Sequence, residues 1–290
     1  MSNPIAANAA TRVQKRVVSP FSPIERGRLF AGLALIGFVN GISHRVVEAL
    51  REDPGRALLH AFDIGAVVWI ALLASLYLFV RQQGQAASRR DMLAAGLAFA
   101  AFLAPAPPVS WLGLSGLSVY IAVTSPLGSA SRRSAWILLA LTVPMFWSRI
   151  LFLLMSDAIL RFDAVLVGLI LGTGRSGNAI AFADGWGYFW IAPQCSSLAN
   201  ISLALLCWVV VTQALRRPNA ALRYCLLAVV SVIVINVMRL ALTGISHTNY
   251  ELLHGAAGNL ILGWFTFAVT LSICLYGATR EVRHAVAASS

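Results

Sequence analysis

Residues 195–215 read CSSLANISLALLCWVVVTQAL, an apolar run that begins with a cysteine and contains no charged side chain. A continuous apolar stretch of about 20 residues is long enough to cross a bilayer as an α-helix. Two further long runs follow, at 222–245 and 251–276. Because lipid offers the backbone no hydrogen-bond partner, each run is expected to be helical, and successive runs to be antiparallel.

The composition places the whole chain among membrane proteins. Of its 290 residues, 59% are hydrophobic and only 11% are charged, and the mean hydropathy is +0.78. In a soluble domain about a quarter of the residues are charged. The net charge of +11 does not indicate nucleic-acid binding, because the Arg residues cluster in short loops between apolar runs and so report topology.

The rest of the chain completes an all-α, polytopic integral membrane bundle of about eight transmembrane helices. Further spans are expected at 29–43 (extending toward residue 47), 58–80 (which includes Asp63), 92–104, 109–125 and 134–155. A charged loop is expected at 45–57, and Pro144 should kink its helix. The predicted organisation is a cytoplasmic tail at 1–28, a single transmembrane catalytic domain at 29–276 and a second cytoplasmic tail at 277–290.

Segment 158–172 is the ambiguous piece, since it is short and carries Arg161 and Asp163. An interfacial or partly inserted helix is therefore expected there. If it does not cross, fifteen Lys and Arg residues lie inside and five outside, with Arg149 and Arg239 in the membrane. Loop charge favours this arrangement, which places the start of the run at 195–215 on the periplasmic or exterior side.

Residues 178–191 read NAIAFADGWGYFWI and predict a short external β-hairpin. Asp184-Gly185 is a strong two-residue hairpin turn between β-capable flanks. Trp186, Tyr188 and Trp190 form one aromatic face, which is typical of an aromatic belt at the membrane interface. The same hairpin could also offer an edge onto which an extended peptide pairs.

Cys195, Arg239 and His254 lie on three successive runs, at similar depth on one membrane face. A thiol is a strong nucleophile once part of it is thiolate, and both a helix N-terminus and a guanidinium favour that form. Histidine gives and takes protons near neutral pH. An intramembrane Arg is costly, and is a functional-site hypothesis by default. The pattern therefore indicates a catalytic set.

Each residue also has a structural explanation. A lone cysteine near a helix end is usually packing, Arg239 can snorkel to the interface, and His254 can be an interfacial histidine. These explanations would have to hold independently for three residues at matched depth. Cys207, Cys225 and Cys274 lie inside apolar runs and are expected to be small buried hydrophobes, and no cysteine spacing indicates a metal site or a cofactor.

Neighbouring residues offer alternatives and support. Ser196 and Ser197 compete with the cysteine as nucleophile, and His247 competes with His254 as base. Glu251 lies three residues before His254 on the same helical face and could orient its ring. Asn236 shares a face with Arg239, where it could hold the guanidinium or bind substrate.

These residues resemble the exosortase/archaeosortase family of membrane transpeptidases. The matching motifs are Cys195-Ser196-Ser197, Asn236-Val-Met-Arg239 and His254-Gly-Ala-Ala-Gly258, in the family's order on successive helices. The resemblance implies a Cys–Arg–His catalytic set at the outer membrane face. It also implies substrates that are exported, membrane-anchored proteins whose carboxy-terminal sorting signal has a short motif, a hydrophobic span and a basic end. Ser197 replaces the family's usual Gly, which indicates a divergent subgroup.

The sequence therefore predicts a cysteine peptidase or transpeptidase (a hydrolase) of the cytoplasmic, or inner, membrane that works through a thioester. The runner-up is a non-enzymatic membrane component of polysaccharide or protein export, in which Arg149 and Arg239 act structurally or in anion passage. A transporter is a third possibility, but no internal repeat or matched pair of broken spans is present.

The charge count predicts that loop 216–223 is cytoplasmic and loop 173–193 external. Single cysteines introduced at Asn219 and Ser176 should therefore react differently with a membrane-impermeant maleimide in intact cells. Ser176→Cys should label, and Asn219→Cys should label only after the cells are opened. Labelling of the Asn219 variant from outside would show that the last three helices are inverted.

Overall fold

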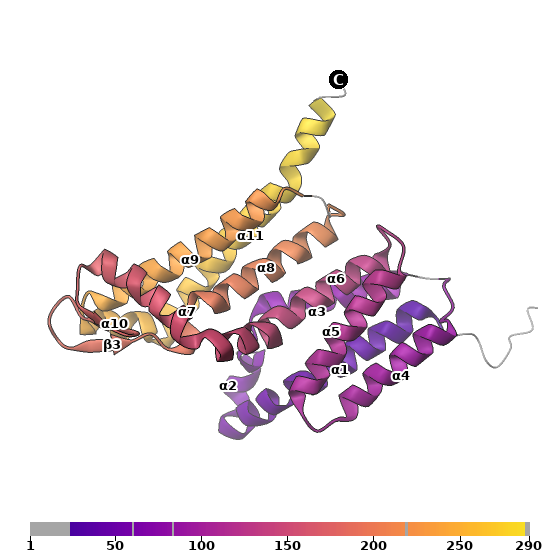
Figure 1. The fold of residues 1–290 in the computed structure, drawn as a ribbon, viewed down its shortest axis with the longest axis horizontal. Coiled ribbons are helices and arrows are strands. Elements are labelled where there is room, and N and C mark those ends of the chain that lie inside the picture. Colours follow the sequence, from indigo (N-terminus) through magenta and orange to yellow (C-terminus); the bar gives the residue numbers. More distant parts are fainter. Residues whose placement is uncertain (1–23, 60, 83, 218–219, 288–290) are drawn as a thin grey trace, which may run out of the picture.

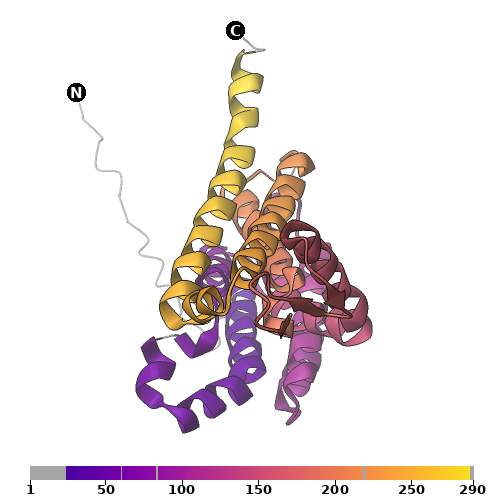
Figure 2. The same cartoon turned by 90° about the vertical axis from the view of Figure 1, so that its left-hand side faces the viewer.

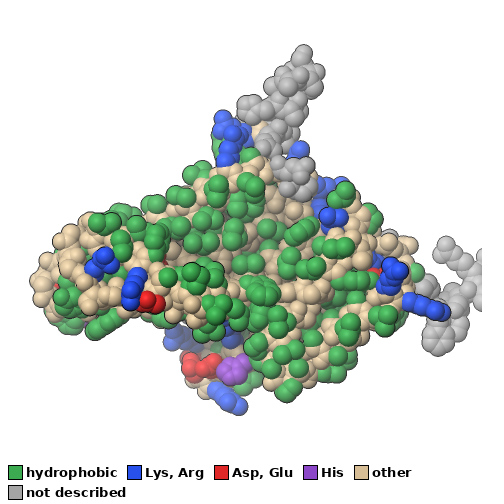
Figure 3. Space-filling view, viewed as in Figure 1, with side chains coloured by type: hydrophobic (Ala, Val, Ile, Leu, Met, Phe, Trp, Pro, Cys, Tyr) green, Lys and Arg blue, Asp and Glu red, His purple; other side chains and the backbone are tan. Residues whose placement is uncertain are grey.

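The computed structural model describes residues 24–59, 61–82, 84–217 and 220–287, and most of this part of the chain is helical (Figure 1). The predicted tail at 1–28 lies largely outside the described residues. Five of the helices in this part are long and apolar enough to cross a membrane: α1 (Arg26–Glu52), the joined α6–α7 segment (Ala130–Leu171), α8 (Ser197–Ala214), α9 (Leu222–Gly244) and α11 over Ala257–Arg280. In Figure 3, hydrophobic side chains cover the middle of the visible face, and Lys and Arg gather toward its periphery. By length and composition, these helices are compatible with a multi-pass membrane protein.

Five helices of the N-terminal half share one apolar core. They are α1, α3 (Ala66–Arg81), α4 (Arg89–Leu103), α5 (Pro107–Thr124) and α6 (Ala130–Thr142). The largest fully buried side chains of this core include Phe30, Phe38, Phe79, Leu114, Ile121, Ile137, Leu138 and Leu141. Small residues let the helices approach, as at Gly37, where an added Cβ would lie 2.6 Å from the Phe102 ring.

A buried polar cluster joins the ends of three of these helices. The Arg26 guanidinium donates from Nε to Asp91 Oδ1 at 2.9 Å, from Nη1 to Ser125 Oγ at 2.8 Å and from Nη2 to Thr124 Oγ1 at 2.6 Å. Tyr120 Oη donates to the same Asp91 oxygen at 3.0 Å. The start of α1, the start of α4 and the end of α5 therefore lie at one level of the bundle.

Two expectations for the N-terminal half are wrong. The expected loop 45–57 is mostly helical, because α1 runs on to Glu52 before α2 (Pro54–Leu59) begins. The expected span 58–80 is shorter, because Ala61–Asp63 has left-handed backbone with φ of +50° to +60°. A left-handed stretch cannot continue an α-helix, so α3 starts only at Ala66 and Asp63 lies exposed outside it.

The long segment that follows α5 is bent twice. A π-helix at Val143–Trp147 includes Pro144, where the sequence predicts a kink, and α7 (Ser148–Leu171) contains Met155 with non-helical φ of −131°. Figure 1 shows the chain changing direction between α6 and the end of α7. The part of α7 after Met155 packs against α9 and the sheet, as Ala164 and Val167 show.

The C-terminal half is built around α8, α9 and α11 (Ala256–Ala287). Cys207, Cys225 and Cys274 are buried where these three helices meet, as expected for small apolar side chains. The expected run 251–276 is interrupted: a short helix, α10 (His247–His254), ends at extended Gly255 before α11 begins. The helix of α11 also continues beyond Tyr276 into the predicted tail at 277–290.

A three-stranded antiparallel sheet lies between α7 and α8, in the order β1 (Arg175–Ser176), β2 (Ala179–Ala181) and β3 (Tyr188–Trp190). The sequence predicts β2 and β3 but not β1. Gly185 has φ +79°, but the turn closes through the Gly185 N–H and the Phe182 carbonyl, so its central residues are Ala183 and Asp184. The Phe182 N–H also bonds the Gly187 carbonyl, so the four residues 183–186 connect the strands, and the predicted two-residue turn at Asp184-Gly185 is wrong.

Asp91→Ala should destabilise the protein strongly, because it leaves the Arg26 guanidinium buried without its counter-charge. Removing one member of a buried pair typically costs about 3–5 kcal/mol. The matched control is Asp157→Ala, whose partner Arg161 lies at 2.8 Å in an exposed pair worth about 0–1 kcal/mol. Thermal unfolding in one detergent should show a much lower Tm for the first variant only. Equal Tm values would mean that the Arg26 cluster does not stabilise the bundle.

Candidate active site

The candidate residues come together at one end of the molecule. In Figure 1, β3 and α10 lie side by side next to the C-terminal end of α9, and Figure 2 turns this end toward the viewer. The chain enters α8 at Ser197 from this end and leaves α9 here at Gly244. Successive antiparallel helices therefore bring positions 195, 239 and 254 to one level of the bundle.

Cys195 closes a short 3-10 helix, Pro193–Cys195, immediately before the N-cap of α8 at Ser196. Its N–H bonds the Ala192 carbonyl at 2.9 Å, and its side chain is buried. The sequence suggests that Cys195 lies near the first turn of the helix. In the structure it precedes α8. Its neighbours belong to the apolar cluster between α7, the sheet and α9, so its packing is also that of a small hydrophobe.

Asn236 holds this turn in place. Its Nδ2 donates to the Cys195 carbonyl at 2.8 Å and to Ser197 Oγ at 3.2 Å, while its Oδ1 accepts from Asn200 Nδ2 at 3.1 Å. The side chain is buried, and both of its N–H groups are used. Asn236 therefore contacts the cysteine backbone and not the Arg239 guanidinium that the sequence offered as a partner.

Asp163 is part of the site, and sequence reasoning missed it. Its Oδ2 accepts the Ser197 N–H at 2.9 Å, so the positive N-terminus of α8 is capped by a carboxylate instead of facing the thiol. The carboxylate is fully buried, and its Oδ1 has no partner within the described residues. The sequence does contain a signal for this residue, because a carboxylate in an apolar segment is energetically costly and marks a functional or structural contact.

Arg239 and His254 are electrostatic neighbours. His254 ends α10, and its Nδ1 is buried without a hydrogen-bond partner in the described part of the chain. Burial, and then the positive charge of Arg239, lower the pKa of His254 from its ordinary 6.5. The imidazole is therefore neutral at pH 7. Within residues 24–59, 61–82, 84–217 and 220–287, no carboxylate pairs with Arg239.

A stack of rings connects His254 with the sheet. His254 stacks on Tyr250 with ring centroids 4.3 Å apart, and His247 stacks on Trp186 at 3.9 Å. Glu251 Oε1 lies 3.9 Å from His247 Nδ1, and no such contact joins Glu251 to His254. The structure therefore corrects the predicted role of Glu251, which reaches the alternative base and not the expected one.

The turn of the sheet is bonded to the junction of α9 and α10. The Ala183 N–H donates to the Gly244 carbonyl at 2.9 Å, and Asp184 Oδ2 accepts the His247 N–H at 3.2 Å. A Cβ at Gly244 would lie 2.8 Å from the Phe189 ring. The sheet therefore fixes where α10 starts, and with it the position of His254.

Gly258, which the family resemblance singles out, has a steric role. A Cβ added there would lie 2.4 Å from the Leu252 carbonyl oxygen and 2.8 Å from Leu253 Cα. Only glycine lets the first turn of α11 approach the end of α10 this closely. The spacing between His254 and Gly258 is thus the spacing of a tight helix–helix corner.

The outer edge of the sheet is β3. Tyr188 and Trp190 are exposed, with 52% and 68% of their surface accessible, whereas Phe189 between them is buried. Trp186, in the loop before β3, is 63% exposed. In this register the backbone groups of Phe189 face β2, so those of Tyr188 and Trp190 face outward from the sheet. An aromatic edge strand beside the site is available for pairing.

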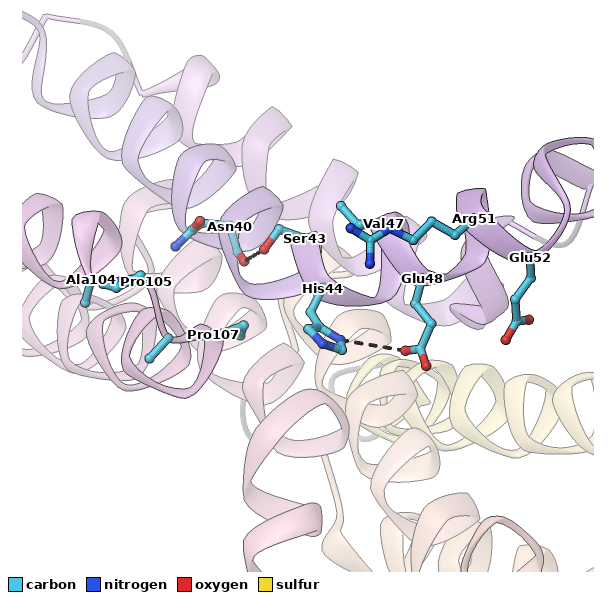
Figure 4. A pocket seen from close by; sticks show the side chains of 11 residues that line it. Asn40, Ser43, His44, Val47, Glu48, Arg51, Glu52, Ala104, Pro105 and Pro107 are labelled. Carbon is cyan, nitrogen blue, oxygen red and sulfur yellow. Dashed lines mark hydrogen bonds and ion pairs between the residues drawn. The ribbon is translucent and has the colours of Figure 1, made fainter.

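The hollows in the described part of the bundle include the two that follow. A cavity of about 620 Å³ between α3, α8, α9 and α11 reaches Asn236 and Arg239. A second hollow of about 590 Å³ lies between the end of α1 and the α4–α5 turn. Figure 4 shows it with His44 pointing at Glu48, whose nearest N and O atoms are 3.6 Å apart. None of the candidate catalytic residues lines the second hollow.

The thiol itself is not engaged. In the described part of the chain, Cys195 Sγ makes no hydrogen bond to Arg239, His254 or any other group. No three His, Cys, Asp or Glu side chains among these residues are arranged to hold a metal ion. Catalytic hydrogen bonds are often long before substrate binds, so the open spacing does not decide against the set.

Comparison with known proteins adds no relative: the chain matches no family model, no curated protein and no solved structure. The resemblance to exosortases and archaeosortases therefore depends on the three sequence motifs.

His254 should titrate below pH 6.5, and Arg239→Gln should raise its pKa. The direction follows because removal of a nearby positive charge makes the imidazolium less unfavourable, while burial still opposes it. An NMR titration of ¹⁵N-histidine-labelled protein, assigned with His254→Gln, measures this directly. Arg149→Gln is the control, since its side chain is exposed on α7 and is not among the causes of the shift. An unchanged pKa of His254 in Arg239→Gln would show that the charge of Arg239 does not act on His254.

Proposed function

We propose that this chain is a membrane-embedded cysteine peptidase or transpeptidase of the exosortase/archaeosortase type, which cleaves carboxy-terminal sorting signals of exported proteins. One observation carries the proposal. The turn that presents Cys195 is bonded to Asn236 of α9. One turn further along α9 lies Arg239, whose positive charge acts on a neutral His254. A nucleophile, a cation and a base are thus held at one level by three elements.

The proposed membrane arrangement has eight crossings: α1, α3, α4, α5, the segment from α6 to Met155 of α7, α8, α9 and α11. Contacts at opposite ends support the alternating directions of α1, α4 and α5. The start of α1 bonds the start of α4 and the end of α5, through Arg26, Asp91 and Ser125. At the other end, Asn40 donates to the Phe102 carbonyl and to Ser110 Oγ, near the end of α4 and the start of α5. With the part of α7 after Met155 not crossing, the distribution of positive charge supports a Cys195 end that lies outside the inner membrane.

The first chemical step is attack by sulfur. The neutral His254 imidazole accepts the Cys195 proton, and the thiolate adds to the scissile carbonyl carbon. The carbonyl oxygen becomes an oxyanion, which the Arg239 guanidinium stabilises together with the thiolate that precedes it. The absence of a competing carboxylate partner among the described residues leaves the Arg239 donors free for this task.

The second step releases the sorting tail. The tetrahedral intermediate collapses, the C–N bond breaks, and the imidazolium of His254 gives its proton to the departing amine. The product is a thioester on Cys195. An amine or water then loses a proton to His254 and attacks the thioester, so that the thiol is restored by the same proton. An amine acceptor makes the reaction a transfer, and water makes it hydrolysis.

The sheet is proposed to present the substrate. An extended peptide can add to the outer edge of β3, where the backbone groups of Tyr188 and Trp190 face outward. The exposed rings of Trp186, Tyr188 and Trp190 would pack on its side chains. Because the turn of the sheet is bonded to the start of α10, a peptide paired there lies next to the element that carries His254.

The alternative is a non-enzymatic component of polysaccharide or protein export. One observation favours it: Cys195 packs among apolar side chains, and its sulfur makes no hydrogen bond in the described residues. In that case the three residues would be structural, and their chemistry would not matter to function.

Cys195→Ala separates the two functions. It should abolish processing of a tagged substrate with a sorting tail, while the protein inserts at its normal level, because the thioester cannot form. Cys207→Ala is the matched control, since it removes another buried thiol from the same helix, and it should stay active. Normal processing by Cys195→Ala would contradict the enzyme and support the export component.

Arg239→Lys tests whether the guanidinium acts in chemistry. A snorkelling Arg needs only a long cationic side chain, which Lys also supplies. A guanidinium that binds an oxyanion uses several donors in a fixed fork, and losing one such donor costs about 100- to 1000-fold in rate. Processing at matched enzyme levels should therefore fall by at least about 100-fold. Arg149→Lys should be near wild type, and equal rates in the two variants would remove Arg239 from the catalytic set.

A further inference from the structure

The cavity that reaches Arg239 has the polarity of an amphiphile. Three asparagines and Arg239 line it near the ends of α8, α9 and α11 that lie beside the sheet: Asn200, Asn236, Asn259. Deeper along the same helices its walls are mainly apolar, as at Leu73, Cys207 and Phe267. The two threonine hydroxyls of the deep part are bonded to carbonyls of their own helix. One end of the cavity is thus polar and cationic, and the rest is apolar.

The depth of the cavity matches half a bilayer. On α11 its wall extends from Asn259 to Thr270, which is about 16 Å at 1.5 Å per residue. On α9 it extends from Arg239 to Val232, or about 10 Å. The hydrocarbon core of a bilayer is about 30 Å thick. A bound transmembrane helix would need a surface along the whole thickness of the bilayer. A lipid acyl chain from one leaflet needs only the depth of this cavity.

The polar end is suited to an anion. Arg239 has no carboxylate partner and makes no side-chain hydrogen bond in the described residues, although it lines the cavity. Asn236 cannot serve as the main donor, because both of its N–H groups already bind Cys195 and Ser197. A cation in contact with an apolar cavity is stabilised by a counter-charge, and a guanidinium matches the oxygens of a phosphate.

We propose that this cavity binds one membrane phospholipid, with its phosphodiester on Arg239 and one acyl chain between α3, α8, α9 and α11. The lipid comes from the leaflet on the side of the sheet and α10. The volume of the cavity, about 620 Å³, is within the range of small-molecule sites. The assignment goes beyond the proposed cleavage reaction, since it needs neither the thiol nor a peptide substrate.

Gly263→Leu tests the acyl-chain part. Gly263 lines the cavity, and a Cβ there meets nothing within 4 Å, so a side chain fills the space without a clash. The matched control is Gly116→Leu, at an exposed glycine of α5 that is equally open but does not line the cavity. Native mass spectrometry after detergent exchange should find one retained phospholipid in wild type and in Gly116→Leu, and none in Gly263→Leu. Equal retention in all three would overturn the proposal.

Lipid arms identify the ligand. Phosphatidylglycerol should raise the Tm of wild type and of Gly116→Leu but not of Gly263→Leu. Diacylglycerol, which lacks the phosphate, and inorganic phosphate, which lacks the chain, should each do much less. Arg239→Gln should weaken phosphatidylglycerol binding by about tenfold or more, as expected when charged hydrogen bonds are lost. An equal Tm shift with inorganic phosphate alone would show an anion site and overturn the lipid assignment.

The outcome is independent of the proposed reaction, because Cys195→Ala should retain the lipid as wild type does. If Gly263→Leu keeps the lipid but loses cross-linking to a substrate's hydrophobic span, the cavity holds that span and not a lipid. If Cys195→Ala processes substrate normally while Gly263→Leu loses the lipid, the enzyme is contradicted and the lipid site stands.

Discussion

The Asn236 carboxamide is the interaction on which the candidate site depends. It joins the turn before α8 to the middle of α9 through the Cys195 carbonyl and Ser197 Oγ, and it also accepts a hydrogen bond from α8 through Asn200. In a low-dielectric interior such a bond is strong when made and costly when broken. Because Arg239 follows Asn236 by three residues, one short stretch of α9 determines both where the cysteine backbone lies and where the cation lies.

The sheet holds the element that carries His254 in position, as Asn236 holds the turn that carries Cys195. Its turn is bonded to Gly244 and to the His247 N–H, so the end of α9 and the start of α10 move with it. Stacked rings then continue from His247 toward His254. Under the proposed function, a peptide that pairs with β3 would therefore be connected to His254 through backbone hydrogen bonds and ring contacts.

Arg239 lies where two proposed roles meet. Toward the sheet it acts on His254, and toward the bundle it lines the cavity between α3, α8, α9 and α11. A phosphate held by the same guanidinium would neutralise part of its charge, and would so weaken its effect on the imidazole. Together, the two proposals couple the chemistry of the site to the composition of the surrounding leaflet through this one side chain.

The membrane class, the apolar runs and the level of Cys195, Arg239 and His254 follow from the sequence alone, because helix length, charge in loops and antiparallel order are properties of local stretches. Helix boundaries were harder to predict. The left-handed turn at Ala61–Asp63 and the corner at Gly255 interrupt apolar runs, and the polar side chains there, Asp63 and His254, do not by themselves mark a break.

Only the tertiary structure decided which side chains meet. Asp163 looked like a reason for an interfacial helix, yet it is buried against the N-terminus of α8, because α7 bends at Met155 and packs on α9. Glu251 was placed beside His254 by helical spacing, but its carboxylate turned toward His247. Spacing along one helix fixes which face a residue is on. The partner of a buried charge is fixed by neighbouring helices, whose packing no local pattern encodes.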